Sequence, residues 1–318
     1  KIEIRFFDAA GKPTAGTRGY AGWRKTFDAL GNQTGLRYLG INGAVVLKDG
    51  NAGFQARFDE WSREVERVYI DEVGQPKLQG WGGAGWQDSF DKFGRHVARS
   101  FAGVDGEPVL HKNGYAGWRA EYDPNGNRTS LTYVGLEGRP VLNKDAHARV
   151  EYDYDARGNR IEWRWLGLDG APGTDISGPN AISRQRKTYD VFGREIEYRR
   201  YGTDGELVNA YGWAIARTER DIHGKPIRRA YFDSNDRPVG RANGGGRIAT
   251  WVRAFDRFGR VIEERFVGVD GKATTDDRGV HIVRCERDRR GKVVAYEHLD
   301  QGLAAISLTS SPSEDCKA

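Results

Sequence analysis

Residues 114–140 read GYAGWRAEYDPNGNRTSLTYVGLEGRP, and the chain repeats this pattern along its length. An alternating segment ends at Tyr122, and a tight turn of the form Asp-x-x-Gly follows at residues 123–126. A second alternating segment runs to Tyr133, and a second turn at residues 135–138 closes the unit. Such internal periodicity indicates a repeat protein rather than one globular core.

The first turn recurs nine times, at spacings of 31, 32 or 35 residues. Its fourth position is glycine in every copy except one, where Ser62 replaces it. From that position to the end of the second turn there are 12 residues in every copy except the last, which has 11. The constant half therefore predicts a rigid element between two fixed turns, and the variable half predicts a loop that tolerates insertion. The turn aspartates are Asp28, Asp59, Asp91, Asp123, Asp155, Asp190, Asp221, Asp256 and Asp288.

The constant half has the pattern of a β-strand. The residue three places after the turn glycine is β-branched in all nine copies, and the residue seven places after it is aromatic in most. An offset of four puts both on one face of a strand, where such side chains pack well. The β-branched residues are Thr34, Val65, Val97, Thr129, Ile161, Ile196, Ile227, Ile262 and Val294.

The segment before each turn predicts the partner strand of a β-hairpin. An aromatic residue precedes most of the turn aspartates, as Tyr122 precedes Asp123, and another large apolar residue, such as Trp118, lies four places earlier. Aspartate hydrogen-bonds to its own turn, and glycine adopts positive φ at low cost. Residues 60–72 (EWSREVERVYIDE) have helical spacing instead, but their register against the other copies predicts a strand.

These patterns predict an all-β fold in which tandem hairpins of about 32 residues stack side by side in one long, twisted or spiralling antiparallel sheet. We expect one array of about nine units over residues 1–302, and a C-terminal cap and tail over residues 303–318. A β-propeller is the alternative. It needs four strands per blade, whereas each unit offers two clear strands and a weak third at residues 140–142.

Composition fits an elongated array with a thin core. Only 38% of the residues are hydrophobic and the mean hydropathy is −0.71, yet 36 aromatic residues at fixed register indicate a folded chain. The net charge is +5, but 45 acidic residues are interspersed with 50 basic ones. The densest basic area therefore does not predict nucleic-acid binding. It comprises Arg194, Arg199, Arg200, Arg228 and Arg229 among Glu195, Glu197 and Asp204.

No motif predicts a cofactor, a metal or catalysis. One aspartate per turn does not supply the six to eight oxygens that calcium needs, and the six histidines lack zinc-binding spacing. A catalytic site also requires one unique constellation, whereas most unusual residues here recur between copies. We expect no enzyme; a hidden site would lie in the longer loops at residues 173–185 or 240–248.

Two further features leave alternatives open. Cys285 and Cys316 predict either a disulfide that ties the tail to the last hairpin or two free thiols. A row of tryptophans at matching positions predicts either a ladder of exposed rings that binds sugars or a protein partner, or rings that cover the backs of the hairpins. These tryptophans are Trp23, Trp86, Trp118 and Trp251.

The strings Tyr122–Asn127, Tyr154–Asn159 and Tyr189–Arg194 (Tyr-Asp-x-x-Gly-Asn/Arg) resemble the YD (RHS-type) repeats of bacterial surface and secreted proteins. The longer period and the added second turn mark this chain as a longer-period relative. The resemblance implies β-hairpin sheets that spiral around, shield or present something else, with no catalytic residue in the repeats.

We therefore expect a non-catalytic scaffold or protein-interaction array, extracellular or in the cell envelope of a bacterium. Its partner would be another protein or further copies of the chain. A carbohydrate-binding module that uses an exposed tryptophan ladder is the alternative. No apolar run reaches the ~20 residues needed to span a bilayer. The chain begins mid-unit at Lys1, which fits both a processed secreted protein and a fragment.

Overall fold

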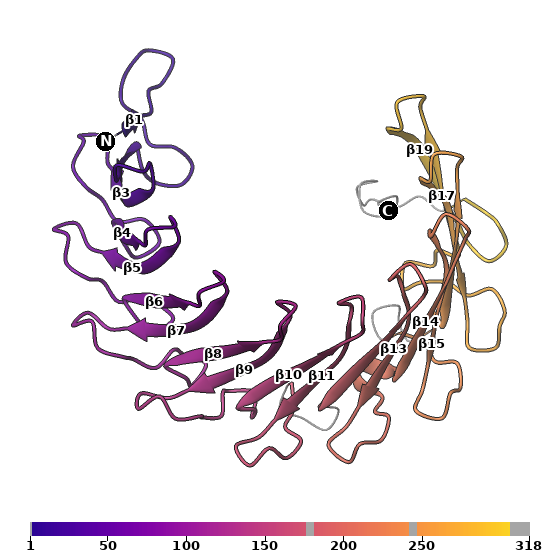
Figure 1. The fold of residues 1–318 in the computed structure, drawn as a ribbon. Helices are drawn as coiled ribbons and strands as arrows, with labels where there is room; N and C mark the ends of the chain where they lie inside the picture. The colour runs from indigo at the N-terminus through magenta and orange to yellow at the C-terminus, as the bar shows by residue number, and fades with distance from the viewer. Residues whose placement is uncertain (1, 176–180, 242–246, 306–318) are drawn as a thin grey trace. The chain divides into compact units, whose positions relative to one another are not determined.

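The computed structural model describes residues 2–175, 181–241 and 247–305, and this part of the chain is almost entirely β-structure (Figure 1). Its nineteen strands belong to one antiparallel sheet, so the predicted all-β hairpin fold is confirmed. The strands are β1 (Ile2–Arg5), β2 (Gly22–Phe27), β3 (Gln33–Leu39), β4 (Gly53–Phe58), β5 (Glu64–Ile70), β6 (Gly85–Phe90), β7 (His96–Ala102), β8 (Gly117–Tyr122), β9 (Arg128–Val134), β10 (Arg149–Tyr154), β11 (Arg160–Leu166), β12 (Arg184–Tyr189), β13 (Glu195–Tyr201), β14 (Ile215–Arg220), β15 (Pro226–Phe232), β16 (Thr250–Phe255), β17 (Val261–Val267), β18 (Ile282–Arg287) and β19 (Val293–Leu299).

The chain divides into two compact units. The first unit comprises Lys1–Glu151 with Gly167–Ala171, and the second comprises Tyr152–Leu166 with Pro172–Ala318. Each unit is described by itself below. The single array over residues 1–302 stays a prediction. The cap over residues 303–318 also stays a prediction, because residues 306–318 lie outside the described part.

In the first unit every strand pairs with the next one along the chain. Within the hairpin β8–β9, Trp118 lies opposite Tyr133, and across to the preceding hairpin Trp118 lies opposite Arg99. The same registers recur in β2–β3, β4–β5 and β6–β7 and in the pairs that join them. Pairing therefore continues from hairpin to hairpin and does not break into four-stranded blades. The β-propeller alternative is wrong.

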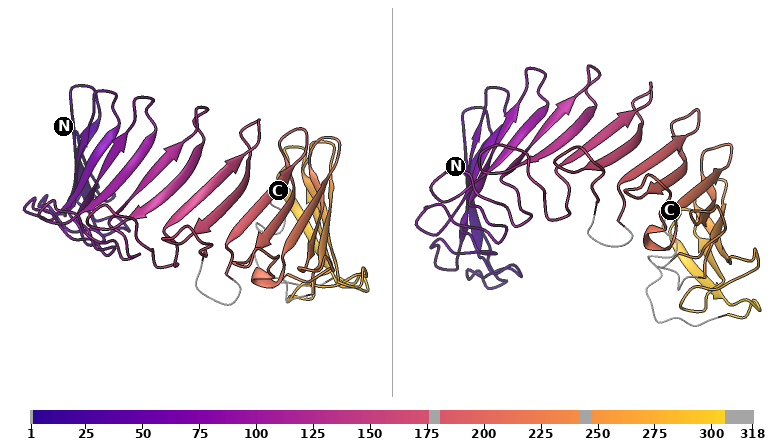
Figure 2. Two further views of the ribbon diagram at one scale, coloured as in Figure 1. Left: turned by 60° about the horizontal axis from the view of Figure 1, so that its bottom comes forward. Right: turned by 90° about the horizontal axis from the view of Figure 1, so that it is seen from below.

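The second unit repeats this arrangement. Hairpins β12–β13, β14–β15, β16–β17 and β18–β19 pair internally and with one another. In Figure 2 the short hairpin loops lie along one edge of each unit, and the longer connections lie along the other. The weak third strand predicted at residues 140–142 is only an isolated bridge between Val134 and Pro140.

The first turns have the predicted chemistry. The Asp123 carboxylate accepts the backbone N–H of Asn127 at 2.8 Å, and the N–H of Gly126 donates to the Asp123 carbonyl at 3.1 Å. Gly126 has a φ of 88°, in the left-handed region that glycine adopts most easily. Ser62 takes the same conformation, with a φ of 63°. The turn thus imposes its geometry even where glycine is absent, and residues 64–70 form the predicted strand.

A β-bulge follows each of these turns wherever the strand register is defined. In β8–β9 the pairing shifts between Glu121 and Tyr122, and Thr129 is the extra residue. Equivalent shifts leave Val97, Ile196 and Ile262 as the extra residues of their strands. The β-branched position therefore lies in the strand, as predicted, but the bulge at this position interrupts the alternation that was expected to put it on the same face as the aromatic position. Thr34, for example, donates from its hydroxyl to that of Thr26 at 3.2 Å, on the face opposite Trp23. Bulges increase the local strand twist.

The buried core includes a line of mostly small residues beside the second turns, next to larger side chains such as Leu39 and Ile70. Ala116 is 2% exposed; its N–H donates to Val134 at 2.7 Å and its carbonyl accepts from Phe101 at 2.8 Å. It thereby joins two hairpins. The next residue must be small, and it is Gly117. The neighbouring strand passes so close that a Cβ at this position would lie 2.2 Å from the Arg99 carbonyl oxygen. The residues equivalent to Ala116 are buried too: Ala21, Ala52, Ala84, Ala148, Ser183, Ala214, Ala249 and His281.

Candidate interaction surfaces

Each predicted tryptophan lies half-buried on one face of its hairpin, which we call the aromatic face. Trp118, for example, lies in β8 opposite Tyr133. The other three are placed equivalently, Trp23 opposite Tyr38, Trp86 opposite Phe101 and Trp251 opposite Phe266. The predicted register is confirmed, whereas ligand binding by these rings stays a prediction.

The tryptophan rings are partly covered by neighbouring side chains, mostly cations. The Lys25 ammonium lies 4.7 Å from the centre of the Trp23 ring, and Arg253 lies 4.4 Å from that of Trp251. Trp86 has two guanidinium neighbours, and Trp118 has the His96 ring at 4.5 Å. Such cation–π contacts stabilise the face. A ligand that stacks on these rings would have to share them with the chain's own side chains.

A second row of aromatic rings on this face was missed. Tyr115 lies 4.6 Å from Tyr133, ring centre to ring centre, and the same position holds Tyr20 at 5.1 Å from Tyr38. In the second unit, Trp213 lies 5.3 Å from Tyr231. The signal was present in the sequence, because the string Tyr-Ala-Gly-Trp occurs at both residues 20–23 and 115–118.

The opposite face, which we call the polar face, has carboxylates held between arginines. Glu197 accepts from Arg199 at 2.7 Å and from Arg217 at 2.9 Å. Partial burial opposes ionisation of Glu197, but these two bonds outweigh it and lower the pKa of its carboxyl group. Glu263 has the same arrangement between Arg265 and Arg284. The bonds to Arg217 and Arg284 join strands from neighbouring hairpins, so these carboxylates stabilise the sheet.

The side chains of the dense basic area predicted from the sequence lie on both faces of the sheet and at its edge. Arg199 and Arg200 point to opposite faces because they are adjacent in a strand. Arg228 pairs with Glu219 at 2.5 Å, Arg229 lies 3.4 Å from Glu195, and Arg194 binds its own turn aspartate. These cations therefore form no continuous basic surface.

Arg200 occupies an aromatic position of the repeat. Its guanidinium lies 3.4 Å from the centre of the Trp213 ring and donates to the Ala210 carbonyl at 2.5 Å. Burial lowers the pKa of Arg200. A planar guanidinium thus replaces an aromatic ring in the stack, where it is held by a carbonyl and an indole.

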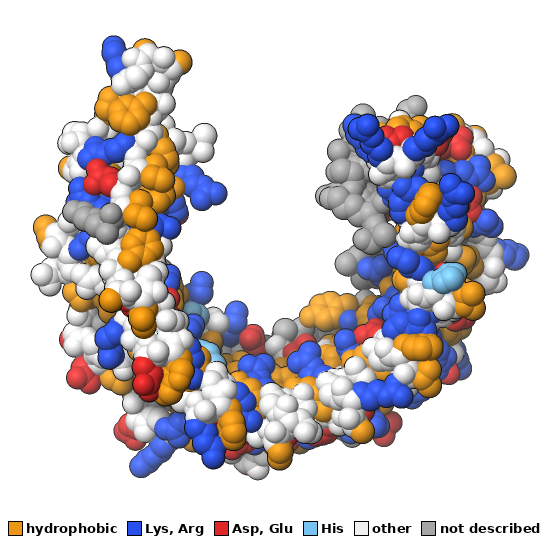
Figure 3. Space-filling model, turned by 45° about the horizontal axis from the view of Figure 1, so that its top comes forward, with side chains coloured by type: hydrophobic (Ala, Val, Ile, Leu, Met, Phe, Trp, Pro, Cys, Tyr) orange, Lys and Arg blue, Asp and Glu red, His pale blue; other side chains and the backbone are white. Residues whose placement is uncertain are grey.

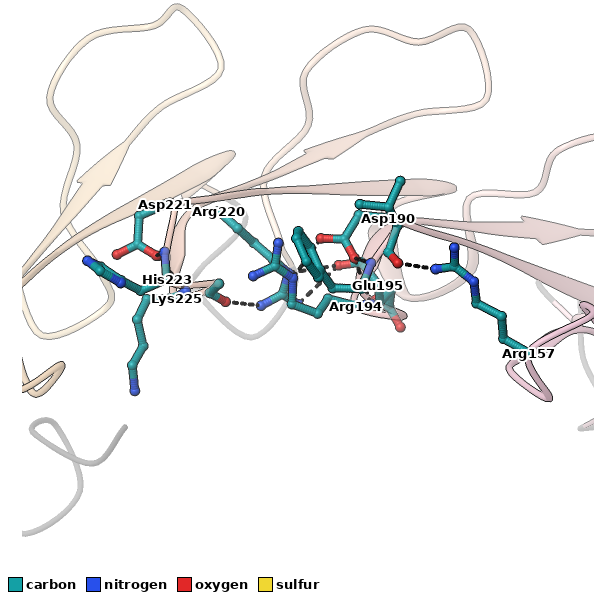
Figure 4. Close-up of polar contacts among 11 residues, drawn as sticks. Arg157, Asp190, Arg194, Glu195, Arg220, Asp221, His223 and Lys225 are labelled. Atoms are coloured by element: carbon teal, nitrogen blue, oxygen red, sulfur yellow. Dashed lines mark hydrogen bonds and ion pairs between the residues drawn. The ribbon is translucent and has the colours of Figure 1, made fainter.

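The first turns of the second unit lie in contact with one another, and their edge is the third candidate surface. The Arg157 guanidinium donates to the Val191 carbonyl in the next turn. The Arg194 guanidinium lies so close to Gly224 that a Cβ added there would meet it at 2.0 Å. Arg220 donates to the carbonyls of Glu195 and Gly224, both at 3.0 Å. Figure 4 shows the side chains of three successive turns in one row.

The described residues contain no group of three or more histidine, cysteine, aspartate or glutamate side chains that could hold a metal ion. One groove in the second unit is open, with a volume of about 510 Å³, and it is lined in part by Lys225, Arg253 and Phe255. The described part of the chain also holds no helix with the length and apolar character that crossing a membrane requires.

Two predictions fall on residues that are not described. The longer loops at residues 173–185 and 240–248 include residues 176–180 and 242–246, which lie outside the described part. Cys285 is buried in β18, whereas Cys316 lies outside the described part. A catalytic site in those loops and the Cys285–Cys316 disulfide therefore remain untested.

No protein-family model matches the chain, and no curated protein matches it. Among solved structures, the chain is similar to the TcdB2-TccC3-Cdc42 crystal structure, with 11% identity and a TM-score of 0.39 over 88% of this chain and 14% of that one. It is also similar to the Photorhabdus luminescens Tc holotoxin pore, with 13% identity and a TM-score of 0.39 over 89% of this chain and 13% of that one. The chain spans about a seventh of the length of these structures' chains.

Proposed function

We propose that the chain is a non-catalytic β-repeat scaffold that binds another protein or further copies of itself. The supporting observation is that charged side chains of the repeat bind other groups of the same chain. The turn carboxylate of Asp123 binds its own turn, Glu197 binds two arginines, and Arg253 covers Trp251. Equivalent contacts recur between successive hairpins. A surface of this kind offers the same side chains repeatedly, which suits an extended partner.

The bacterial exterior is part of this proposal. It rests on the resemblance of the turn strings at residues 122–127, 154–159 and 189–194 to YD repeats of surface and secreted proteins. In such a setting the two faces of the sheet are the surfaces on which a partner would lie, because both carry half-buried side chains rather than a covering layer.

Photocrosslinking from each face tests the scaffold function. A benzoylphenylalanine is placed at Arg119 on the polar face, or at Trp118 on the aromatic face, in the producing bacterium. We expect a discrete adduct with one protein, or with a second copy of the chain, from one of the two sites. Absence of any adduct from both sites, together with a single monomeric species in sedimentation velocity, would contradict the proposal.

Carbohydrate binding remains the second candidate, because the four tryptophans are only half-buried. Rings that stack on sugars change their fluorescence when the sugar binds. We expect the Trp118→Ala variant to remove any such change if this function is correct. An unchanged emission spectrum across a broad glycan panel would rule it out.

A further inference from the structure

The first turns of the second unit carry large apolar side chains at their tips. Phe192 is 75% exposed, Ile222 is 92% exposed and Phe258 is 63% exposed. They occupy the two central positions of successive turns, where side chains are not needed for the turn's own hydrogen bonds. Arginine guanidinium groups lie beside the two phenyl rings, Arg194 at 4.7 Å from the centre of Phe192 and Arg257 at 4.8 Å from that of Phe258. Large apolar side chains exposed together on one edge indicate an interaction surface.

The same edge is strongly basic. Residues 155–159, 190–194, 221–225, 256–260 and 288–292 contain eight lysines and arginines against five aspartates. The aspartates are occupied within their turns: Asp190 accepts the backbone N–H of Phe192 and of Arg194, and its second oxygen accepts the Arg194 side chain at 2.6 Å. Within these five stretches no exposed carboxylate compensates the exposed cations. They include Arg257, Arg289, Arg290 and Lys292.

The corresponding edge of the first unit differs in charge alone. Its turns also expose apolar tips, at Leu30, Trp61 and Phe93. Residues 28–32, 59–63, 91–95 and 123–127, however, contain three cations against five acidic side chains. The two units therefore share the apolar tips that the repeat supplies, and only the second adds positive charge. This difference distinguishes a specific basic surface from a general property of the repeat.

The turns of the second unit also form a continuous row. Contacts from Arg157 to Val191, from Arg194 to Gly224 and from Arg260 to Gly291 join successive turns. Two strands separate equivalent tips, so neighbouring tips lie about 10 Å apart. In the space-filling view of Figure 3, hydrophobic and basic side chains lie interspersed on the visible surface.

We propose that this edge docks on an anionic lipid surface, with Phe192, Ile222 and Phe258 entering the interfacial region and the neighbouring arginines and lysines contacting lipid phosphates. A bilayer interface accepts separate projecting side chains, whereas a protein partner would need a matching pocket for each one. Shallow apolar insertion combined with basic residues is a two-signal mode of membrane attachment. This attachment goes beyond the scaffold function and uses a different surface from the two sheet faces.

Flotation of the full chain with lipid vesicles tests the proposal. We expect binding to vesicles of phosphatidylcholine with phosphatidylserine and roughly a hundredfold weaker binding to phosphatidylcholine alone, because about three or more cations act within the Debye length. Added salt is expected to weaken the binding. Absence of binding to the anionic vesicles at low salt would overturn the proposal.

Three variants locate the surface. The tip variant combines Phe192→Ser, Ile222→Ser and Phe258→Ser, and the charge variant combines Arg257→Gln, Arg289→Gln and Arg290→Gln. Each is expected to lower vesicle binding roughly tenfold or more, since each removes one of the two signals. The control variant combines Leu30→Ser, Trp61→Ser and Phe93→Ser in the first unit, and it is expected to bind as the unchanged chain does.

Two outcomes would contradict this assignment. If the control variant lost binding to the same extent, the apolar tips of the first unit would contribute equally, and the basic edge of the second unit would not be the specific binding surface. Binding to immobilised polyglutamate, with none to anionic vesicles, would assign the edge to an acidic polypeptide instead. Circular dichroism of all three variants identifies any that fails to fold, and single substitutions at Ile222 and Arg290 then replace it.

Discussion

Tyr122 donates a hydrogen bond from its hydroxyl to the backbone carbonyl of His96, 2.8 Å away in the preceding hairpin. Tyr189 makes the same bond to Arg160 at 2.9 Å, and Arg220 makes it to Glu195 at 3.0 Å. Two unrelated side chains thus serve one purpose, which is to tie each hairpin to its neighbour. A hairpin alone is marginally stable in water, so these ties matter.

Removing this hydroxyl is expected to destabilise the array. Tyr122→Phe keeps the ring but loses the bond to His96, so the free energy of unfolding should fall by about 1 kcal/mol. Urea unfolding measures the change. Tyr115→Phe is the matched control, because Tyr115 contributes only ring contacts among the described residues. An equal loss in both variants would show that the hydroxyl bond contributes nothing.

The exceptional turn at Ser62 predicts a stabilising substitution. A non-glycine residue with positive φ costs about 1–2 kcal/mol, while glycine costs about 0.5–1 kcal/mol of backbone entropy. Ser62→Gly should therefore stabilise the chain by up to about 0.5–1 kcal/mol, because the hydrogen bond that it removes, from Asn32 to the Ser62 hydroxyl at 3.1 Å, is exposed. Gly126→Ser, at a position with open space around it, should destabilise it by a similar amount. Thermal unfolding checks both, and shifts of the same sign would refute the shared turn geometry.

The arginine-flanked carboxylate predicts a loss of stability in acid. The folded pKa of Glu197 is lower than the ordinary value of 4.5, so the unfolded chain binds the proton first as the pH falls. Its contribution is complete above that value and is lost as the pH drops through the folded pKa. Glu197→Gln should remove up to about 1 kcal/mol of stability at neutral pH. It should also flatten the dependence of stability on pH below about 4.5.

Unfolding in urea at neutral and acid pH measures this effect. Glu107→Gln, in an exposed second turn, is the control and should leave the pH dependence unchanged. If Glu197→Gln and the unchanged chain lose stability in parallel as the pH falls, Arg199 and Arg217 do not stabilise the carboxylate.

The spacing of turns and strands could be predicted because each depends on local chemistry. Asp123 and Gly126 determine a turn within four residues, and alternation determines the face of Trp118. Comparison between the copies also gave the right secondary structure where the local pattern did not, since residues 64–70 form a strand despite their helical spacing. Repetition therefore supplied the information that a single segment lacks.

Contacts between hairpins could not be predicted to the same extent. The burial of Ala116 depends on where the neighbouring strand passes, and alanine alone gives no sign of it. The bulge at Thr129 is likewise invisible in a period of two. The pairing of Glu197 with Arg217 requires the register between β13 and β14, which local patterns do not determine.

A cross-link between neighbouring hairpins tests the repeat register, on which the account depends, most directly. Ala98 and Arg119 lie opposite each other in β7 and β8, while Ala120 faces the other side of the sheet. Oxidation of Ala98→Cys with Arg119→Cys should form a disulfide that peptide mapping identifies, because directly opposed residues have the Cα separation that disulfides need. Ala98→Cys with Ala120→Cys should form none. A disulfide in the second pair and none in the first would contradict the account.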